Sequence, residues 1–144
     1  MFKRILVPTD GSDITAHAVD TAIQLAKVHG AQLLTLSVME PFPYSAVSEI
    51  QPVPPQEFID AQQRVATQRV EAVTAAAAAQ GLPCKAHTAE ALHAWEAIVD
   101  HAKAENVDLI VMASHGRKGF AALLLGSEAQ KVLTHIETPV LIVK

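Results

Sequence analysis

The sequence predicts an α/β fold in which helices cover both faces of an open parallel sheet. Five short apolar runs are separated by segments whose apolar residues recur every three or four positions, as in amphipathic helices. The runs are continuous rather than alternating, which is typical of strands buried on both faces of a sheet. The 144 residues show no internal repeat and no break in composition, so we expect one domain over 1–144.

The first half of the chain predicts a strand, a helix, a second strand and a loop. Residues 2–8 form an apolar run that ends at a proline, and a helix then runs from Ser12 to Gly30. A second strand covers 31–38, and the loop 39–56 holds five of the eight prolines, which prevent regular structure there. The apolar positions expected to face the core from this helix are Ala16, Val19, Ile23 and Ala26.

The second half of the chain continues the alternation of helices and strands. The expected elements are a helix over 56–80, a weak strand over 84–88, a helix through 92–102, a strand over 107–113, a helix after Gly126 and a strand over 138–143. The apolar stripes of the three helices are Ile59, Ala66, Val70, Val73 and Ala77; Leu92, Trp95, Ile98, Val99 and Ala102; and Ala129, Val132 and Leu133.

Composition excludes several classes of protein. The net charge is −4 and the basic residues are scattered, so the chain lacks the basic stripe of a nucleic-acid-binding protein. The single cysteine, Cys84, excludes an intrachain disulfide and a multi-thiolate metal site, which favours the reducing cytoplasm. The chain shows no signal-peptide stretch and no run near the ~18 apolar residues of a membrane span, so we expect no membrane insertion.

A ligand site is expected beyond the carboxyl ends of the strands, where the winding of such a sheet reverses. The loops at that edge begin at Pro8, at Val38 and at Ala113. Gly116, Gly119 and Gly126 lie within eleven residues, just before a helix. Backbone N–H groups of such a loop and the positive end of the helix favour binding of a phosphate.

Familiar catalytic and phosphate motifs are absent. The chain has no G-x-x-x-x-G-K-S/T, no G-x-G-x-x-G after a strand, no G-x-S-x-G and no H-E-x-x-H. His115 lies beside the glycines but has no nucleophile or fixed partner, so we interpret it as structural or exposed to solvent. No catalytic residue is assigned and no metal-ligating residue is assigned.

Four segments of the chain resemble the universal stress protein family. They are Ile5–Ser12 (ILVPTDGS), Leu109–Gly116 (LIVMASHG), Leu123–Ser127 (LLLGS) and Thr138–Val143 (TPVLIV). The resemblance implies a five-stranded parallel sheet of order 3-2-1-4-5, Rossmann-like and similar to the adenine nucleotide alpha hydrolases. It also implies a homodimer formed through the last strand, 138–143. That strand is too apolar to be left in water, and its proline suits a sheet edge.

The ATP-binding branch of the family carries the motif G-x-x-G-x9-G-S/T. This chain resembles it at Gly116, Gly126 and Ser127, with the same spacing, and departs from it at Ala113. The methyl group of Ala113 would crowd a ribose if the backbone there required positive φ or close approach.

The resemblance implies a role for each candidate site residue. Asp10 would accept hydrogen bonds from the adenine or ribose, and Val38 would offer its backbone to the adenine edge. The remaining residues would line the base and sugar pocket (Pro8, Thr9, Met112 and Ala113) or hold phosphates through backbone N–H groups (Gly116, Arg117, Gly126, Ser127 and Glu128). A cation such as Mg²⁺ would bridge the phosphate oxygens. Ser127 has a second interpretation, since Ser127-x-x-Gln130 is a capping box.

The resemblance implies a cytoplasmic stress-response protein that binds ATP and acts as a nucleotide-dependent regulatory module on an unidentified protein partner. ATP hydrolysis would be slow at most, because no efficient base is visible. The alternative is a family member that binds AMP or no nucleotide and works purely through protein–protein contacts.

Overall fold

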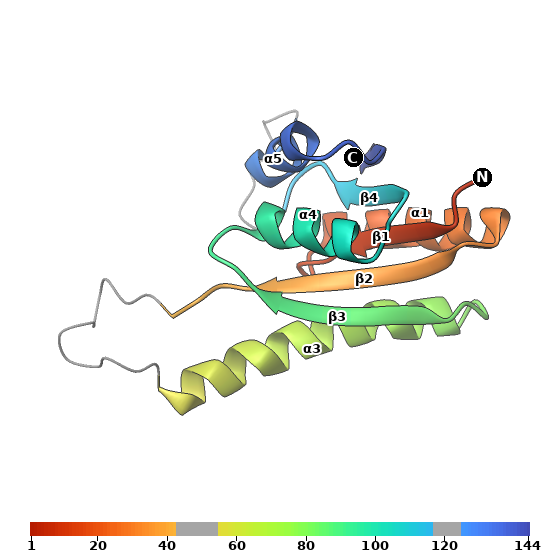
Figure 1. Ribbon diagram of the computed structural model, residues 1–144. Coiled ribbons are helices and arrows are strands. Elements are labelled where there is room, and N and C mark those ends of the chain that lie inside the picture. Colours follow the sequence, from red (N-terminus) through yellow and green to blue (C-terminus); the bar gives the residue numbers. More distant parts are fainter. Residues whose placement is uncertain (43–54, 117–124) are drawn as a thin grey trace.

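The computed structural model describes residues 1–42, 55–116 and 125–144 (Figure 1). In chain order the elements are β1 (Arg4–Pro8), α1 (Asp13–His29), β2 (Gln32–Met39), α3 (Gln56–Ala78), β3 (Cys84–Glu90), α4 (Ala94–Ala104), β4 (Leu109–Ala113), α5 (Ser127–His135) and β5 (Val140–Val143). The strands form one sheet of order β3-β2-β1-β4-β5, and every described pair is parallel. The expected fold class and strand order are confirmed.

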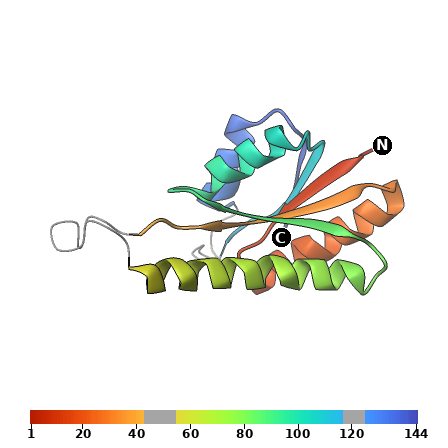
Figure 2. The same cartoon turned by 60° about the horizontal axis from the view of Figure 1, so that its bottom comes forward.

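Two helices cover each face of the sheet (Figure 2). Alternate residues of one strand serve opposite faces: Ile5 packs with α1 and α3, while Leu6 packs with α4 and α5. The central strands β1 and β4 are buried on both sides. This double burial explains why their sequences read as continuous apolar runs.

Edge strand β3 is longer than the expected 84–88. It pairs with β2 over seven residues, from Leu33↔Cys84 to Met39↔Glu90. Its residues Lys85, Ala86 and His87 are exposed, so the strand carries little of the apolar signal from which strands are predicted.

Four residues assigned to apolar stripes are exposed instead: Ala16, Ile59, Leu92 and Leu133. Helix α1 turns Thr15 and Ala18 inward rather than Ala16. Ile59 lies in the first turns of α3, which extend past the ends of β2 and β3 in Figure 1, where no sheet is left to cover it. Leu92 precedes α4, and α5 packs through Ala129 and Val132 instead of Leu133.

Glycines end two helices as the sequence predicts. Gly30 follows α1 in the left-handed region with φ 62°, and its cap N–H bonds back to the carbonyls of Ala26 and Lys27. Gly81 follows α3 with φ 75°. Both backbones adopt the conformation that glycine takes at little cost.

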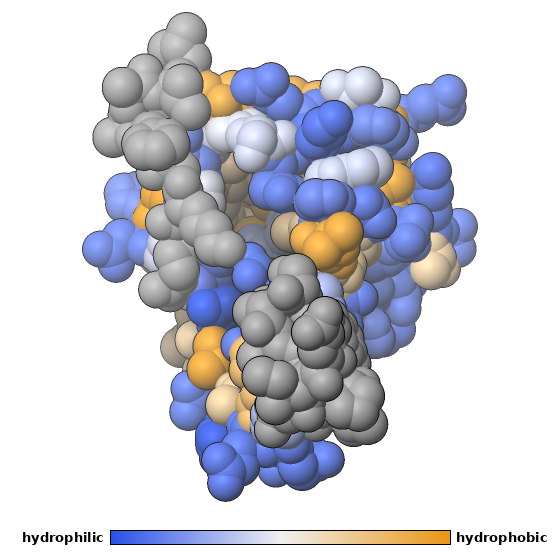
Figure 3. All heavy atoms as spheres, turned by 90° about the vertical axis from the view of Figure 1, so that its left-hand side faces the viewer, coloured by the Kyte–Doolittle hydropathy of each residue, from blue (hydrophilic) through white to orange (hydrophobic). Residues whose placement is uncertain are grey.

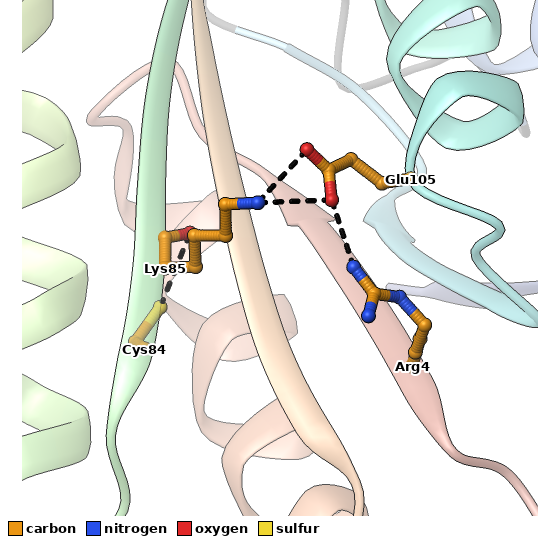
Figure 4. Close-up of polar contacts among 4 residues, drawn as sticks. All are labelled: Arg4, Cys84, Lys85 and Glu105. Atoms are coloured by element: carbon orange, nitrogen blue, oxygen red, sulfur yellow. Dashed lines mark hydrogen bonds and ion pairs between the residues drawn. The ribbon is translucent and has the colours of Figure 1, made fainter.

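A charged cluster ties three elements together at the amino ends of the strands (Figure 4). The Glu105 carboxylate on the C-terminal side of α4 accepts bonds from Arg4 Nη2 at 2.7 Å and from Lys85 Nζ at 3.0 Å. The hydrogen bond from Lys85 lowers the pKa of Glu105. Because ligands of such sheets bind at the other end of the strands, we interpret this cluster as structural.

Strand β5 occupies one edge of the sheet, as expected for a strand that follows Pro139. Its Leu141 side chain is exposed. Within the described ranges, no helix has the length and apolar character needed to cross a membrane.

Candidate functional site

A crevice of about 480 Å³ lies beyond the carboxyl ends of β1, β2 and β4. Figure 3 views this end of the molecule and shows a hollow near its centre with hydrophobic atoms inside. Its volume falls within the roughly 300–1,000 Å³ of small-molecule sites. The crevice is lined by Pro8, Thr9, Asp10, Thr15, Leu36, Val38, Glu40, Gln62, Arg69, Ala91, Leu92, Ala94, Ile98, Met112, Ala113, Ser114, His115, Gly116, Gly126, Ser127, Glu128 and Ala129.

The structure brings together all but one of the site residues predicted from the sequence. Arg117 lies outside the described residues, and every other one lines the crevice. Most come from the loops after β1 and β4 and from the start of α5, which lie far apart in the sequence. The parallel order of the sheet gathers them at one edge.

The loop after β1 holds Asp10 by several hydrogen bonds. Its Oδ1 atom accepts bonds from Ser12 N at 2.9 Å, from Ser12 Oγ at 2.5 Å and from Thr15 Oγ1 at 2.8 Å. The Asp10 side chain is therefore fixed by the turn that leads into α1. Asp10 therefore stabilises the turn and also lines the crevice.

Two glycines of the crevice leave little room for a Cβ atom. A Cβ atom at Gly116 would lie 3.0 Å from Asp10 Oδ2. A Cβ atom at Gly126 would lie 2.9 Å from the carbonyl oxygen of Ser114, to which Gly126 N donates a hydrogen bond at 2.6 Å. Neither glycine has positive φ. The glycines thus let the loops after β1 and β4 and the start of α5 approach closely.

Ala113, which departs from the family motif, is the last residue of β4 and pairs with Val143. Among the described residues, Asn106 is the one non-glycine residue with positive φ. The backbone at Ala113 therefore has no requirement for glycine on conformational grounds. Of the two ways in which Ala113 would crowd a ribose, a requirement for positive φ is therefore excluded, and close approach of the ligand remains.

Helix α5 begins at Ser127, with Gly126 as its N-cap and no side-chain cap bond. The expected capping box is therefore wrong. Gln130 Nε2 donates instead to the carbonyl of Leu125 at 3.0 Å, and Ser127 is exposed at the first helical position. The close approach of Gly126 to Ser114 fixes the start of the helix one residue earlier than the capping box requires.

Glu128 links α5 to α4. Its Oε2 atom accepts a hydrogen bond from the backbone N–H of Trp95 at 2.7 Å, at the second residue of α4. Helix α4 has no cap bond from its own N-cap residue, His93, so the neighbouring helix supplies a negative charge there. Trp95 is half-buried and stacks on His135 with ring centroids 4.2 Å apart.

His115 is held by its neighbour. Its Nδ1 atom lies 3.1 Å from Ser114 Oγ, and its buried Nε2 atom has no hydrogen-bond partner in the described part of the chain. The sequence analysis gave His115 no fixed partner, and the structure corrects this, because the Ser114 hydroxyl lies within hydrogen-bond distance of its ring. Across the described ranges, no group of three His, Cys, Asp or Glu side chains is placed to hold a metal ion.

Sequence reasoning missed one wall of the crevice. Gln62 and Arg69 line it from α3, and Ala91 and Leu92 line it from the loop after β3. Because the apolar signal of β3 is weak, the sequence analysis did not place the loop after β3 at the same edge of the sheet as the other crevice loops. Polar Gln62 interrupts the apolar stripe of α3 where the helix extends beyond the ends of the strands. This interruption is visible in the sequence.

The model of the universal stress protein family matches residues 1–144. The chain is 36% identical over 150 residues to universal stress protein YxiE of Bacillus subtilis, covering 100% of both chains. It is 32% identical over 153 residues to universal stress protein MJ0531 of Methanocaldococcus jannaschii, covering 100% of this chain and 83% of that protein.

Two solved structures are also similar to this chain. The structure of protein MJ0577 superposes with a TM-score of 0.84 at 28% identity, covering 100% of this chain and 96% of that one. A universal stress protein in complex with cAMP superposes with a TM-score of 0.72 at 25% identity, covering 99% of this chain and 97% of that one. On its fold, its crevice and its sequence, the chain belongs to the universal stress protein family.

Proposed function

We propose that this chain binds an adenine nucleotide, ATP with Mg²⁺, in the crevice at the carboxyl ends of β1, β2 and β4. The observation that carries the proposal is the convergence of Asp10, Gly116 and Gly126 at one edge of the sheet, where a Cβ atom at Gly126 would meet the Ser114 carbonyl and one at Gly116 would press on Asp10 Oδ2. The cAMP complex of a related universal stress protein supports an adenine ligand.

The base, the ribose and the phosphates of the nucleotide each face a different group of residues in the crevice. The base lies against Pro8, Val38 and Met112, which are apolar and line the crevice. The ribose hydroxyls donate to Asp10, whose Oδ1 is already fixed by the turn. The phosphates take the N–H groups of Gly116 and of the first turn of α5, which have no intrahelical acceptor. The Gly126 N–H, which the sequence analysis assigned to phosphate, is instead donated to the carbonyl of Ser114.

Nucleotide occupancy sets the state of a regulatory module rather than serving an efficient enzyme. In this proposal the protein is cytoplasmic, forms a homodimer through the β5 edge, where Leu141 is exposed, and acts on a protein partner. ATP hydrolysis is slow at most in this proposal, because the sequence carries no motif of an efficient general base or arginine finger.

A nucleoside monophosphate is the second candidate ligand. It is favoured by the related protein in complex with cAMP, which carries one phosphate. In the remaining alternative, the chain binds no nucleotide and works through protein contacts alone.

Calorimetric titration of nucleotide-stripped protein with ATP, ADP and AMP, with and without Mg²⁺, separates these candidates. The sharpest variant is Asp10→Asn, since the amide oxygen retains the bonds from Ser12 and Thr15 while the second oxygen becomes a donor. We expect ATP to bind the parent protein and affinity to fall about tenfold or more in Asp10→Asn. Asp13→Asn, an exposed site at the start of α1, is the matched control.

Preferential binding of AMP would replace ATP as the ligand. Absence of binding by all three nucleotides would overturn the proposal.

A further inference from the structure

Helix α3 gives the crevice a polar wall that the proposed contacts with ATP leave unused. Gln62 and Arg69 line the crevice from this helix, and their spacing of seven residues places them on one face of it. Side chains of a helix tilt toward its start, and α3 starts at the end of the sheet where β2 and β3 finish (Figure 1). Both side chains therefore reach from the helix toward a ligand in the crevice.

Arg69 is half-buried in this wall and has no anionic partner there. Across the described ranges, no hydrogen bond or ion pair joins its guanidinium to another side chain, whereas Arg4 and Lys85 are both paired with Glu105. A guanidinium presents five N–H donors in a planar fork that matches the geometry of a phosphate group. Arg69 is thus available to an anionic group that a ligand brings into the crevice.

The two faces of the sheet separate Arg69 from the residues proposed to contact the base. Successive residues of a strand face opposite sides, and Val38 and Met112 pack on the side of α4 and α5. Arg69 of α3 and Thr15 of α1 line the crevice from the other side. Asp10 is tied to that second side, because its Oδ1 atom accepts the Thr15 hydroxyl at 2.8 Å.

A nucleotide bound as proposed turns its ribose hydroxyls toward the side of Arg69. Asp10 accepts those hydroxyls, while the 5′-phosphates lie at the start of α5, on the opposite side of the sheet. A group esterified to the 2′ or 3′ oxygen would therefore extend toward α1 and α3. A phosphate in that position would meet the guanidinium of Arg69 and the side-chain amide of Gln62, both of which donate hydrogen bonds.

We propose that Arg69 adapts the crevice to adenine nucleotides that carry a second phosphate on a ribose hydroxyl, at the 2′ or the 3′ oxygen. The inference rests on the proposed nucleotide site and names the class of ligand that this site prefers. Asp10 keeps the remaining hydroxyl, and Arg69 holds the added phosphate by charge-assisted hydrogen bonds.

The test is calorimetric titration of nucleotide-stripped protein with three ligands that differ at the ribose: 5′-AMP, adenosine 2′,5′-bisphosphate and adenosine 3′,5′-bisphosphate. EDTA is present throughout, at constant ionic strength, so that no divalent cation contributes. The parent protein is compared with Arg69→Gln, which removes the charge, and with Arg69→Lys, which retains it. Arg64→Gln is the matched control, because Arg64 is exposed on the same helix and does not line the crevice.

We expect at least one bisphosphate to bind the parent about tenfold or more tightly than 5′-AMP, as hydrogen bonds between charged groups imply. We expect this gain to be lost in Arg69→Gln, kept in part in Arg69→Lys and unchanged in Arg64→Gln. Binding of 5′-AMP stays the same in all four proteins. Urea unfolding checks the fold of Arg69→Gln, in which no described side chain loses a partner. The bisphosphate that binds more tightly identifies the oxygen that carries the second phosphate.

Three results would overturn this inference and leave the nucleotide site standing. They are bisphosphates that bind the parent no more tightly than 5′-AMP, a gain that persists in Arg69→Gln, and an equal loss for all three ligands in Arg69→Gln, which would assign Arg69 to the 5′-phosphate. Absence of binding by all three ligands and by ATP would overturn the site and the inference together.

Discussion

The Oδ2 atom of Asp10 lies 3.0 Å from the position that a Cβ atom would take at Gly116. This approach joins the loops after β1 and β4, and it gives Gly116→Ala a specific consequence. The added methyl group displaces the Asp10 carboxylate, so we expect nucleotide affinity to fall about tenfold with less than about 1 kcal/mol lost in unfolding free energy. Calorimetry and urea unfolding measure the two effects, and unchanged affinity would show that the methyl group does not displace Asp10 from a contact with the ligand.

Gly126→Ala is expected to act on stability as well. Its Cβ atom would lie 2.9 Å from Ser114 O and 3.3 Å from His115 Cα, both of which are backbone atoms that cannot rotate away. We expect a loss of about 1–3 kcal/mol in the free energy of unfolding by urea. Gly30→Ala is the comparison, because no atom lies within 4 Å of its Cβ and its φ of 62° alone costs about 1–2 kcal/mol.

If Gly126→Ala were as stable as the parent, the contact between Gly126 and Ser114 would not constrain the start of α5. A loss of binding without a loss of stability would instead place the effect on the ligand alone.

Ser127→Ala separates the two interpretations of the Ser127 hydroxyl. Because Gly126 is the N-cap and no side-chain cap bond is present, the hydroxyl contributes little to the helix. We expect a change of less than about 0.5 kcal/mol in unfolding free energy, against the ~1 kcal/mol typical of a lost N-cap. We expect a measurable loss of ATP affinity in the same variant. A stability loss of cap size would restore the capping box.

The stacked pair of His87 and His101 predicts that the free energy of unfolding decreases in acid. Their rings lie 4.7 Å apart between β3 and α4. Burial lowers the pKa of His101, with a further contribution from the charge of His87; Glu105 opposes the shift and Lys85 adds to it. Because the folded pKa is below the unfolded value of about 6.5, the unfolded chain binds more protons. The contribution of His101 to stability is therefore present in full above pH 6.5. It is lost as the pH falls through the pKa of His101 in the folded protein.

Urea unfolding between pH 5 and 7.5 measures this slope. We expect His101→Gln to flatten it, and His17→Gln, an exposed histidine on α1, to leave it unchanged. An identical slope in the parent and His101→Gln would assign the acid sensitivity to other groups.

Cys84 is expected to react slowly with thiol reagents in the folded protein. Burial raises the pKa of its thiol from 9.0 to about 11, so at pH 8 the thiolate fraction is about a hundredfold smaller than in the unfolded chain. Colorimetric labelling of the native and urea-unfolded protein measures the two rates. Equal rates would mean that the thiol is freely accessible in the fold.

Several features of this protein follow from short-range patterns in the sequence. The runs at β1 and β4 are apolar because both faces are buried, and Gly30 ends α1 because its backbone is left-handed. Such signals depend on residues a few positions apart, so the order of elements and the crevice loops after β1, β2 and β4 were predicted. The wall from α3 and the loop after β3 was not. The strand order came from the family resemblance and is confirmed by the structure.

The tertiary structure decided the features that depend on elements meeting in space. The Glu128 carboxylate caps α4 rather than its own helix, and Arg69 of α3 reaches a crevice built mainly by other elements. The N-cap of α5 is Gly126 because the chain packs on Ser114, which overrides the local preference for Ser127. The sequence by itself determined the elements and the edge of the sheet where the crevice lies, since these follow from local periodicity. Packing between distant segments determined which side chains face it.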